Sequence, residues 1–297
     1  MLEARLEGRS YVVEREGTTT RSGSSSMNQF NFEEGETLCP SNIIPYNQYD
    51  SEECVSAALC MGLFLLVLNQ KDVHVGLVLE RGPEGMPSPA YVYHVSRLAE
   101  CIASSGTTCS CGVGCGGVCD RGCGGLLQVG VQVLLDKGAP PVYCWPTTHS
   151  STSDDVAMVE AYNKDPTLGA DYWYVLDTVD YFEPRAEIAM AHLDNGHPIV
   201  VNLKMFKETV NFFNDVHPKD VLPTMPVASY RVSIDLEYGH CVLVVGYIKK
   251  TKMFVCINSF GQAWGHGGFF GIPFAAWSTV HIYRAVALLT GHIAYEQ

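Results

Sequence analysis

Two apolar runs near the C-terminal end of the chain predict a pair of strands. Residues 238–247 and 253–261 are rich in β-branched and aromatic side chains, and glycines bound them. The connection between them, residues 248–252, is short and basic, so we expect an antiparallel hairpin. Its turn is expected to be centred near Lys249 and Lys250.

Folding the hairpin in this way places His240 at its open end. Residues near position 259 then lie opposite, and the amide side chain of Asn258 sits beside the imidazole. A histidine whose ring is held by a neighbouring amide is suited to activate a nucleophile. The rest of the chain must supply that nucleophile.

Another apolar run, residues 54–68, is hydrophobic almost all round and predicts a helix in the middle of a domain. Asp50 or Ser51 is suited to cap the N-terminus of this helix. Glu52 and Glu53 are then expected to fill its first turn.

Cys54 is the candidate nucleophile among the 12 cysteines. It lies in the first turn of the predicted buried helix, and a helix N-terminus lowers the pKa of a thiol. Gln48 precedes it by 6 residues, across the loop that leads into the helix. The Gln48 amide and the Cys54 backbone N–H could both donate hydrogen bonds to a developing oxyanion.

The remaining pattern divides the chain into a leader and two parts. Residues 1–38 are polar and charged, and we expect them to be disordered or a leader. We expect residues 39–150 to be mainly helical, and residues 151–297 to be mainly strands after one helix.

Further elements are expected within these parts. They are helices at 91–103, 126–136 and 185–194, a strand or irregular segment at 72–80, a strand at 198–203, and a terminal strand or tail from Tyr283 to Gln297.

Charge and composition exclude some classes of function. The chain has 297 residues and a formal net charge of −13, which argues against nucleic-acid binding because such proteins usually carry a basic patch. No apolar run is long enough to span a membrane. The charged N-terminus does not resemble a secretory signal, so the cysteines indicate a reducing compartment rather than secretion. The sequence leaves the oligomeric state open.

A glycine-rich run at residues 101–125 holds several cysteines. Three interpretations stay open: a thiolate site for zinc or iron, disulfides, or free thiols in a loop. The paired Cys-x-x-Cys pattern of many zinc sites is absent. The cysteines are Cys101, Cys109, Cys111, Cys115, Cys119 and Cys123.

The candidate residues resemble the papain family of cysteine peptidases. Gln48, Cys54, His240 and Asn258 follow one another in the family's order, and papain-type sites consist of Cys, His and Asn. The run Asn258-Ser259-Phe260-Gly261, followed by Trp264-Gly265, is also similar to the family. The resemblance covers most of residues 39–285.

The resemblance implies an α+β fold of two lobes with the active-site cleft between them. A helical lobe, residues 39–150, would carry Cys54, and the cysteine run would be an insertion in it. An antiparallel β-barrel lobe, residues 151–297, would carry His240 and Asn258.

The resemblance also implies a cysteine-type endopeptidase. Cys54 would form a thioester with the substrate, and His240 would act first as general base and then as general acid. Asn258 would orient the imidazole, and Gln48 would stabilise the oxyanion.

The expected partner is a polypeptide substrate, with neither nucleic acid nor a membrane involved. Gly124, Gly125 and Trp264 are expected to bind the substrate in the cleft. No metal and no other cofactor is expected, because the thiol and the imidazole carry the reaction.

The sequence around Cys54 departs from the family. It reads Glu52-Glu53-Cys54-Val55, without the second cysteine and the aromatic residue of the family signature. Phe260 stands where the family usually has tryptophan. We therefore expect a divergent relative of the kind found in viruses and microbes. The stretch before the helical lobe is too short for the family's usual long propeptide, so we also expect a propeptide-free protein, cytoplasmic or virion-associated rather than secreted. Two alternatives are an inactive papain-fold binding or structural protein, and an isopeptidase or acyl transferase.

Overall fold

The structure, a computed structural model, describes residues 44–48, 51–69, 82–103, 125–145, 170–215, 217, 221–227, 238–279 and 281–295. The predicted leader, the segment 72–80 and residues 104–124 of the cysteine run lie outside these residues. None of the helices in the described part of the chain has the length and hydropathy to span a bilayer.

Most of the predicted elements occur. The helices expected near 91–103, 126–136 and 185–194 are α4 (Pro89–Ala103), α5 (Leu127–Asp136) and α7 (Ala186–Asp194). The strand expected at 198–203 is β2 (Ile199–Met205), and the C-terminal stretch forms β6 (Ile282–Tyr295). The sequence pattern does not predict the remaining elements, which are β1 (Tyr172–Phe182), α8 (Lys207–Asn214), β5 (Phe269–Pro273) and the 3-10 turns Gly82–Gly85 and Phe274–Ala276.

The predicted N-cap of helix α2 (Cys54–Leu68) is wrong, because the helix begins only at Cys54. Ser51 does not cap the helix, because its hydroxyl donates to the Gln48 carbonyl oxygen at 2.6 Å and closes a turn before the helix. The residue before the helix is Glu53, whose side chain makes no capping hydrogen bond. Glu52 and Glu53 therefore precede the helix, and Cys54 is its first residue.

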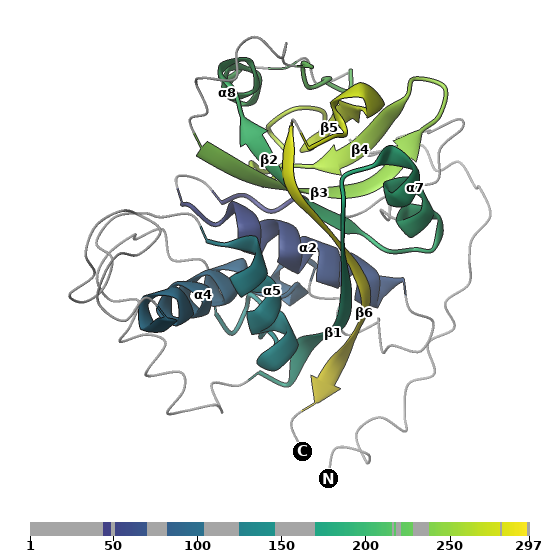
Figure 1. Cartoon of the computed structure of the whole chain (residues 1–297). Coiled ribbons are helices and arrows are strands. Elements are labelled where there is room, and N and C mark those ends of the chain that lie inside the picture. The colour runs from purple at the N-terminus through teal and green to yellow at the C-terminus, as the bar shows by residue number, and fades with distance from the viewer. Residues whose placement is uncertain are drawn as a thin grey trace, which may run out of the picture.

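Helix α2 lies at the centre of the molecule. It contacts β3 and β6 of the sheet and also α4 and α5, and Figure 1 shows it between the sheet and these two helices. Gly62 permits the close approach to the sheet: a β-carbon there would lie 2.8 Å from Leu288 Cδ1 and 3.0 Å from Leu243 Cδ1. This burial on all sides explains why the helix sequence is apolar all round.

The strands form a six-stranded sheet in the order β1-β6-β2-β3-β4-β5, and each pairing is antiparallel. The predicted hairpin is β3 (Tyr238–Ile248) with β4 (Met253–Ile257). Ile248 pairs with Met253, so the turn is centred one residue beyond the predicted Lys249–Lys250 position.

Strand β3 contributes to two hydrophobic cores. Because side chains alternate along a strand, Cys241, Leu243 and Val245 belong to the core that contains α2. Val242 and Val244 belong to the second core, between the sheet and helices α7 and α8. This strand therefore links the helical lobe to the sheet lobe.

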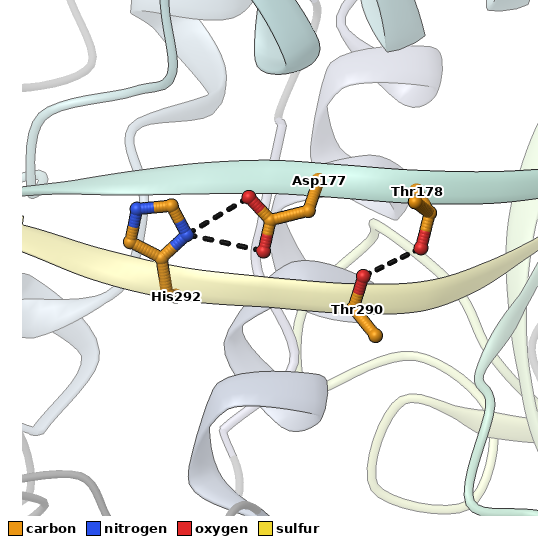
Figure 2. Close-up of polar contacts among 4 residues, drawn as sticks. All are labelled: Asp177, Thr178, Thr290 and His292. Carbon is orange, nitrogen blue, oxygen red and sulfur yellow. Dashed lines mark hydrogen bonds and ion pairs between the residues drawn. The ribbon is translucent and has the colours of Figure 1, made fainter.

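Strands β1 and β6 pair over most of their length. The register shifts around Thr178, and exposed side chains pair across the strands there. His292 Nδ1 lies 2.9 and 3.1 Å from the two carboxylate oxygens of Asp177, and the hydroxyl oxygens of Thr178 and Thr290 are 2.5 Å apart (Figure 2). Exposed ion pairs contribute only about 0–1 kcal/mol, so the pairing depends mainly on the strand hydrogen bonds and on apolar burial.

Candidate active site

Cys54 is the first residue of α2 and only 8% of its surface is exposed. The first four N–H groups of a helix have no acceptor within the helix, so the Cys54 N–H points out of its end. The partial positive charge at this end favours a thiolate over a thiol. The structure thus places Cys54 at a helix N-terminus, as the sequence predicts.

His240 and Asn258 are in direct contact. His240 Nε2 lies 2.8 Å from Asn258 Oδ1, and the Ser259 backbone N–H donates to the same oxygen at 2.9 Å. Because an amide oxygen only accepts, Nε2 carries a hydrogen, and Nδ1 is left for another partner. Asn258 is fully buried, and its backbone N–H donates to the Gly268 carbonyl oxygen at 2.9 Å. Hydrogen bonds therefore fix Asn258 both through its side-chain oxygen and through its backbone.

The other partner of the imidazole is the thiol of Cys54, to which it is hydrogen-bonded. The hydrogen bond from the Cys241 thiol lowers the pKa of Cys54 well below its ordinary value, burial opposes this, and the hydrogen bond and charge of His240 lower it further. Burial disfavours the charged form of His240, but hydrogen bonds to Cys54 and Asn258 and the Cys54 charge raise the pKa of His240 above its ordinary value. Together these shifts favour a thiolate–imidazolium pair.

Hydrogen bonds join Gln48 to Ser259, which follows Asn258, and to Ser51, which precedes the helix of Cys54. Its backbone N–H donates to the Ser259 carbonyl oxygen at 2.9 Å, and the Ser259 hydroxyl donates to Gln48 Oε1. With Oε1 engaged, Nε2 donates one hydrogen to the Ser51 carbonyl oxygen at 2.5 Å. The amide nitrogen carries a second hydrogen, which can serve another acceptor.

Aromatic side chains enclose the imidazole of His240. Phe213 of α8 meets the ring edge-on at 4.9 Å between centroids, and Phe260 lies 5.4 Å from it. Trp264 stacks on Phe213 at 5.6 Å and donates its Nε1–H to the Phe213 carbonyl oxygen at 3.0 Å. Trp264 thus supports the wall around His240, and its contact with substrate stays a prediction.

The two glutamates before Cys54 have different surroundings. Glu53 is 2% exposed and accepts a hydrogen bond from Tyr46 Oη at 2.8 Å. Glu52 is on the surface, yet desolvation and the Cys54 charge raise its pKa while the His240 charge lowers it. Its carboxylate in turn raises the pKa of His240. Glu52 therefore acts electrostatically on both members of the pair.

Of the two glycines predicted to bind substrate, Gly124 lies outside the described residues. Gly125 precedes α5, and a β-carbon there would meet no atom within 4 Å. Helix α5 packs on α2 through Gly130, where a β-carbon would lie 3.3 Å from Val55 Cγ1. A role of the two glycines in substrate binding stays a prediction.

Three residues of this site are not singled out by the sequence analysis. Ser259 and Cys241 directly follow the predicted asparagine and histidine, and this adjacency is the signal that could have found them. Phe213 comes from α8, whose apolar positions Val210 and Phe213 are one helical turn apart. That signal is weak because the helix has only 8 residues.

In the part of the chain that the structure describes, no group of three or more His, Cys, Asp or Glu side chains could hold a metal ion. Residues 104–124 are not among those described. The three interpretations of the cysteine run therefore stay open.

Comparison with known proteins identifies one distant relative by sequence. No model of a known protein family matches the chain. The chain is 26% identical over 189 residues to an uncharacterized peptidase C1-like protein of Acanthamoeba polyphaga mimivirus. That match covers 64% of this chain and 54% of the relative, so it spans about half of the relative's length.

Solved structures of cysteine proteases share the fold. Xylellain, a cysteine protease from Xylella fastidiosa, superposes with a TM-score of 0.61 at 19% identity, over 91% of each chain. The bromelain protease from Ananas comosus superposes with a TM-score of 0.53 at 15% identity, over 86% of this chain and 99% of that chain. These similarities establish a papain-like α+β fold, in which a helical lobe meets an antiparallel sheet lobe. In its fold, and in sequence to its mimivirus relative, the chain is similar to the papain-like (C1) cysteine peptidases.

Proposed function

We propose that this protein is a cysteine-type endopeptidase that hydrolyses peptide bonds through a thioester on Cys54. The observation that carries the proposal is the hydrogen-bonded series Cys54, His240 and Asn258, with the thiol at the first residue of a buried helix. The pKa of the thiol is lowered and that of the imidazole is raised, so both groups favour their charged forms. A thiolate at neutral pH is what a cysteine nucleophile requires.

In the first half of the reaction, the Cys54 thiolate attacks the carbonyl carbon of the scissile peptide bond. His240 then donates the Nδ1 proton to the leaving amine as general acid. Asn258 keeps Nε2–H engaged at 2.8 Å, so the ring holds Nδ1 toward the sulfur. The products of this half are a free amine and a thioester on Cys54.

The negative charge on the carbonyl oxygen needs hydrogen-bond donors. The Cys54 N–H is available because it is the first N–H of α2, and the second amide hydrogen of Gln48 is the other candidate. The Ser259 hydroxyl holds Gln48 Oε1 and so sets the direction of the amide nitrogen. Loss of one such donor typically costs about 2.7–4 kcal/mol in the transition state.

In the second half, neutral His240 takes a proton from water, and the resulting hydroxide attacks the thioester. The carbon–sulfur bond breaks, and the acid product leaves. The Cys54 thiolate and the imidazolium of His240 are restored together.

A pair of variants in the same helix tests this proposal. Cys54→Ala should abolish turnover of a quenched-fluorescent peptide library, whereas Cys60→Ala should retain it. Cys60 is the matched control because it is fully buried in α2, and burial raises its pKa well above the ordinary value. Wild-type turnover should be blocked by iodoacetamide and by E64, the inhibitor in the bromelain structure. Undiminished turnover by Cys54→Ala would refute the proposal.

The same assay separates the alternatives that the sequence leaves open. An inactive papain-fold binding protein cleaves no member of the library under reducing conditions. An isopeptidase cleaves branched but not linear substrates, and an acyl transferase passes the acyl group from Cys54 to an added amine rather than to water. Mass spectrometry of the products distinguishes these outcomes.

A further inference from the structure

Cys241 is a second thiol in the site, and it is neither nucleophile, acid nor base in the steps proposed for peptide hydrolysis. It follows His240 on β3 and is 1% exposed. Strand alternation turns its side chain toward the core that contains α2, and there its thiol lies beside that of Cys54 and acts on its pKa. Both cysteines are free in the structure. Two thiols from elements distant in sequence thus meet at the start of α2.

We propose that Cys54 and Cys241 form a modification site for hydroperoxides, in which oxidation joins the two sulfurs as a disulfide and reversibly blocks the nucleophile. Formation of the disulfide does not require that the protein cleave peptides. Its consequence, the loss of peptidase activity, rests on the function proposed above.

The first step oxidises Cys54. Its thiolate attacks one oxygen of the hydroperoxide, the O–O bond breaks, and the leaving oxygen takes the proton of His240 to become an alcohol, or water from hydrogen peroxide. The product on the protein is Cys54 sulfenic acid. The sulfur of Cys54 has lost two electrons, which the hydroperoxide has gained.

The second step uses Cys241. Its sulfur attacks the sulfur of the sulfenic acid, the S–O bond breaks, and the hydroxyl group leaves with the Cys241 thiol proton as water. In sum, two thiols and one hydroperoxide yield one disulfide, one alcohol and one water. The hydroperoxide is the only oxidant required.

Among the described residues, the other buried cysteines do not combine a lowered pKa with a neighbouring thiol. Cys60 and Cys256 are fully buried, and burial raises the pKa of both thiols well above the ordinary value. A buried thiol that stays protonated is a poor nucleophile toward peroxide. Cys54 has the lowered pKa and Cys241 already contacts its sulfur, so the pair unites an attacking thiolate with a resolving thiol.

Peptide mapping of the full chain tests the inference. Reduced protein is treated with an equimolar amount of hydrogen peroxide, remaining thiols are alkylated, and the unreduced digest is analysed by mass spectrometry. We expect a cross-linked peptide pair containing Cys54 and Cys241, lighter than the two thiol peptides by two hydrogen atoms, and its disappearance with dithiothreitol. The control Cys60→Ala should form the same cross-link.

The variant Cys241→Ser gives an independent readout. Without the resolving thiol, excess peroxide should carry Cys54 to sulfinic acid, which dithiothreitol does not reduce. Wild-type protein in which Cys241 remains fully alkylatable, or in which Cys54 accumulates as sulfinic acid under the same treatment, overturns the inference. A peptide-cleavage assay run in parallel separates the two proposals: a cross-link in a protein that cleaves no peptide refutes only the peptidase, and cleavage without a cross-link refutes only the disulfide.

Discussion

Replacing Asn258 by alanine should weaken catalysis by a magnitude that the structure allows us to state. The substitution removes the 2.8 Å hydrogen bond to His240. The ring is positively charged in the favoured ion pair, and a hydrogen bond to a charged group contributes about 1.5–3 kcal/mol. Since about 1.36 kcal/mol corresponds to a tenfold change in rate, kcat/KM should fall by roughly 10- to 150-fold.

The same substitution should have two further effects. The Ser259 N–H loses the acceptor that it contacts at 2.9 Å, and an unsatisfied buried group costs about 1–3 kcal/mol of the free energy of unfolding. The hydrogen bond to Asn258 also raises the pKa of His240. Without it the imidazolium loses its proton at lower pH, so the alkaline limb of the kcat/KM profile should move to lower pH.

The assay is the pH profile of kcat/KM on a peptide substrate, together with urea unfolding of the same samples. Asn195→Ala is the matched control, because Asn195 is exposed and its amide nitrogen donates to the Ala191 carbonyl oxygen, at 2.8 Å, near the end of α7. It should leave the profile unchanged. If Asn258→Ala retains wild-type kcat/KM with an unmoved alkaline limb, the role assigned to Asn258 is wrong.

Three other predictions follow from the same contacts. Glu52→Gln should move the alkaline limb of kcat/KM to lower pH, because the carboxylate raises the pKa of His240; an unmoved limb contradicts this. Ser259→Ala should lower kcat, but by less than the roughly 10²–10³-fold loss that follows removal of an oxyanion donor; steady-state kinetics decide. Gly291→Ala should reduce the free energy of unfolding by about 1–3 kcal/mol through overpacking, because its β-carbon would lie 2.9 Å from a backbone oxygen. Gly125→Ala, with open space around it, should show no such loss in thermal unfolding.

Elements marked by a distinctive run of apolar residues could be predicted from the local sequence. The run that forms α2 is apolar because the helix is covered on all sides, and the hairpin of β3 and β4 is a local pairing across a short turn. The start of α2 could not be predicted in the same way. Ser51 can either cap a helix or close a turn, and it closes a turn around Gln48. Gln48 is held in turn by Ser259, which is 211 residues away.

The sequence by itself determined which groups are available and in what order: a thiol at the start of an apolar helix, and an imidazole and an amide on one hairpin. The tertiary structure alone decided that β3 packs against α2, which brings His240 and Cys241 to the sulfur of Cys54. A pKa depends on burial and on the neighbouring charges and hydrogen bonds. These surroundings come from segments far apart in the chain, so the lowered pKa of Cys54 and the second thiol beside it could not be predicted from the sequence alone.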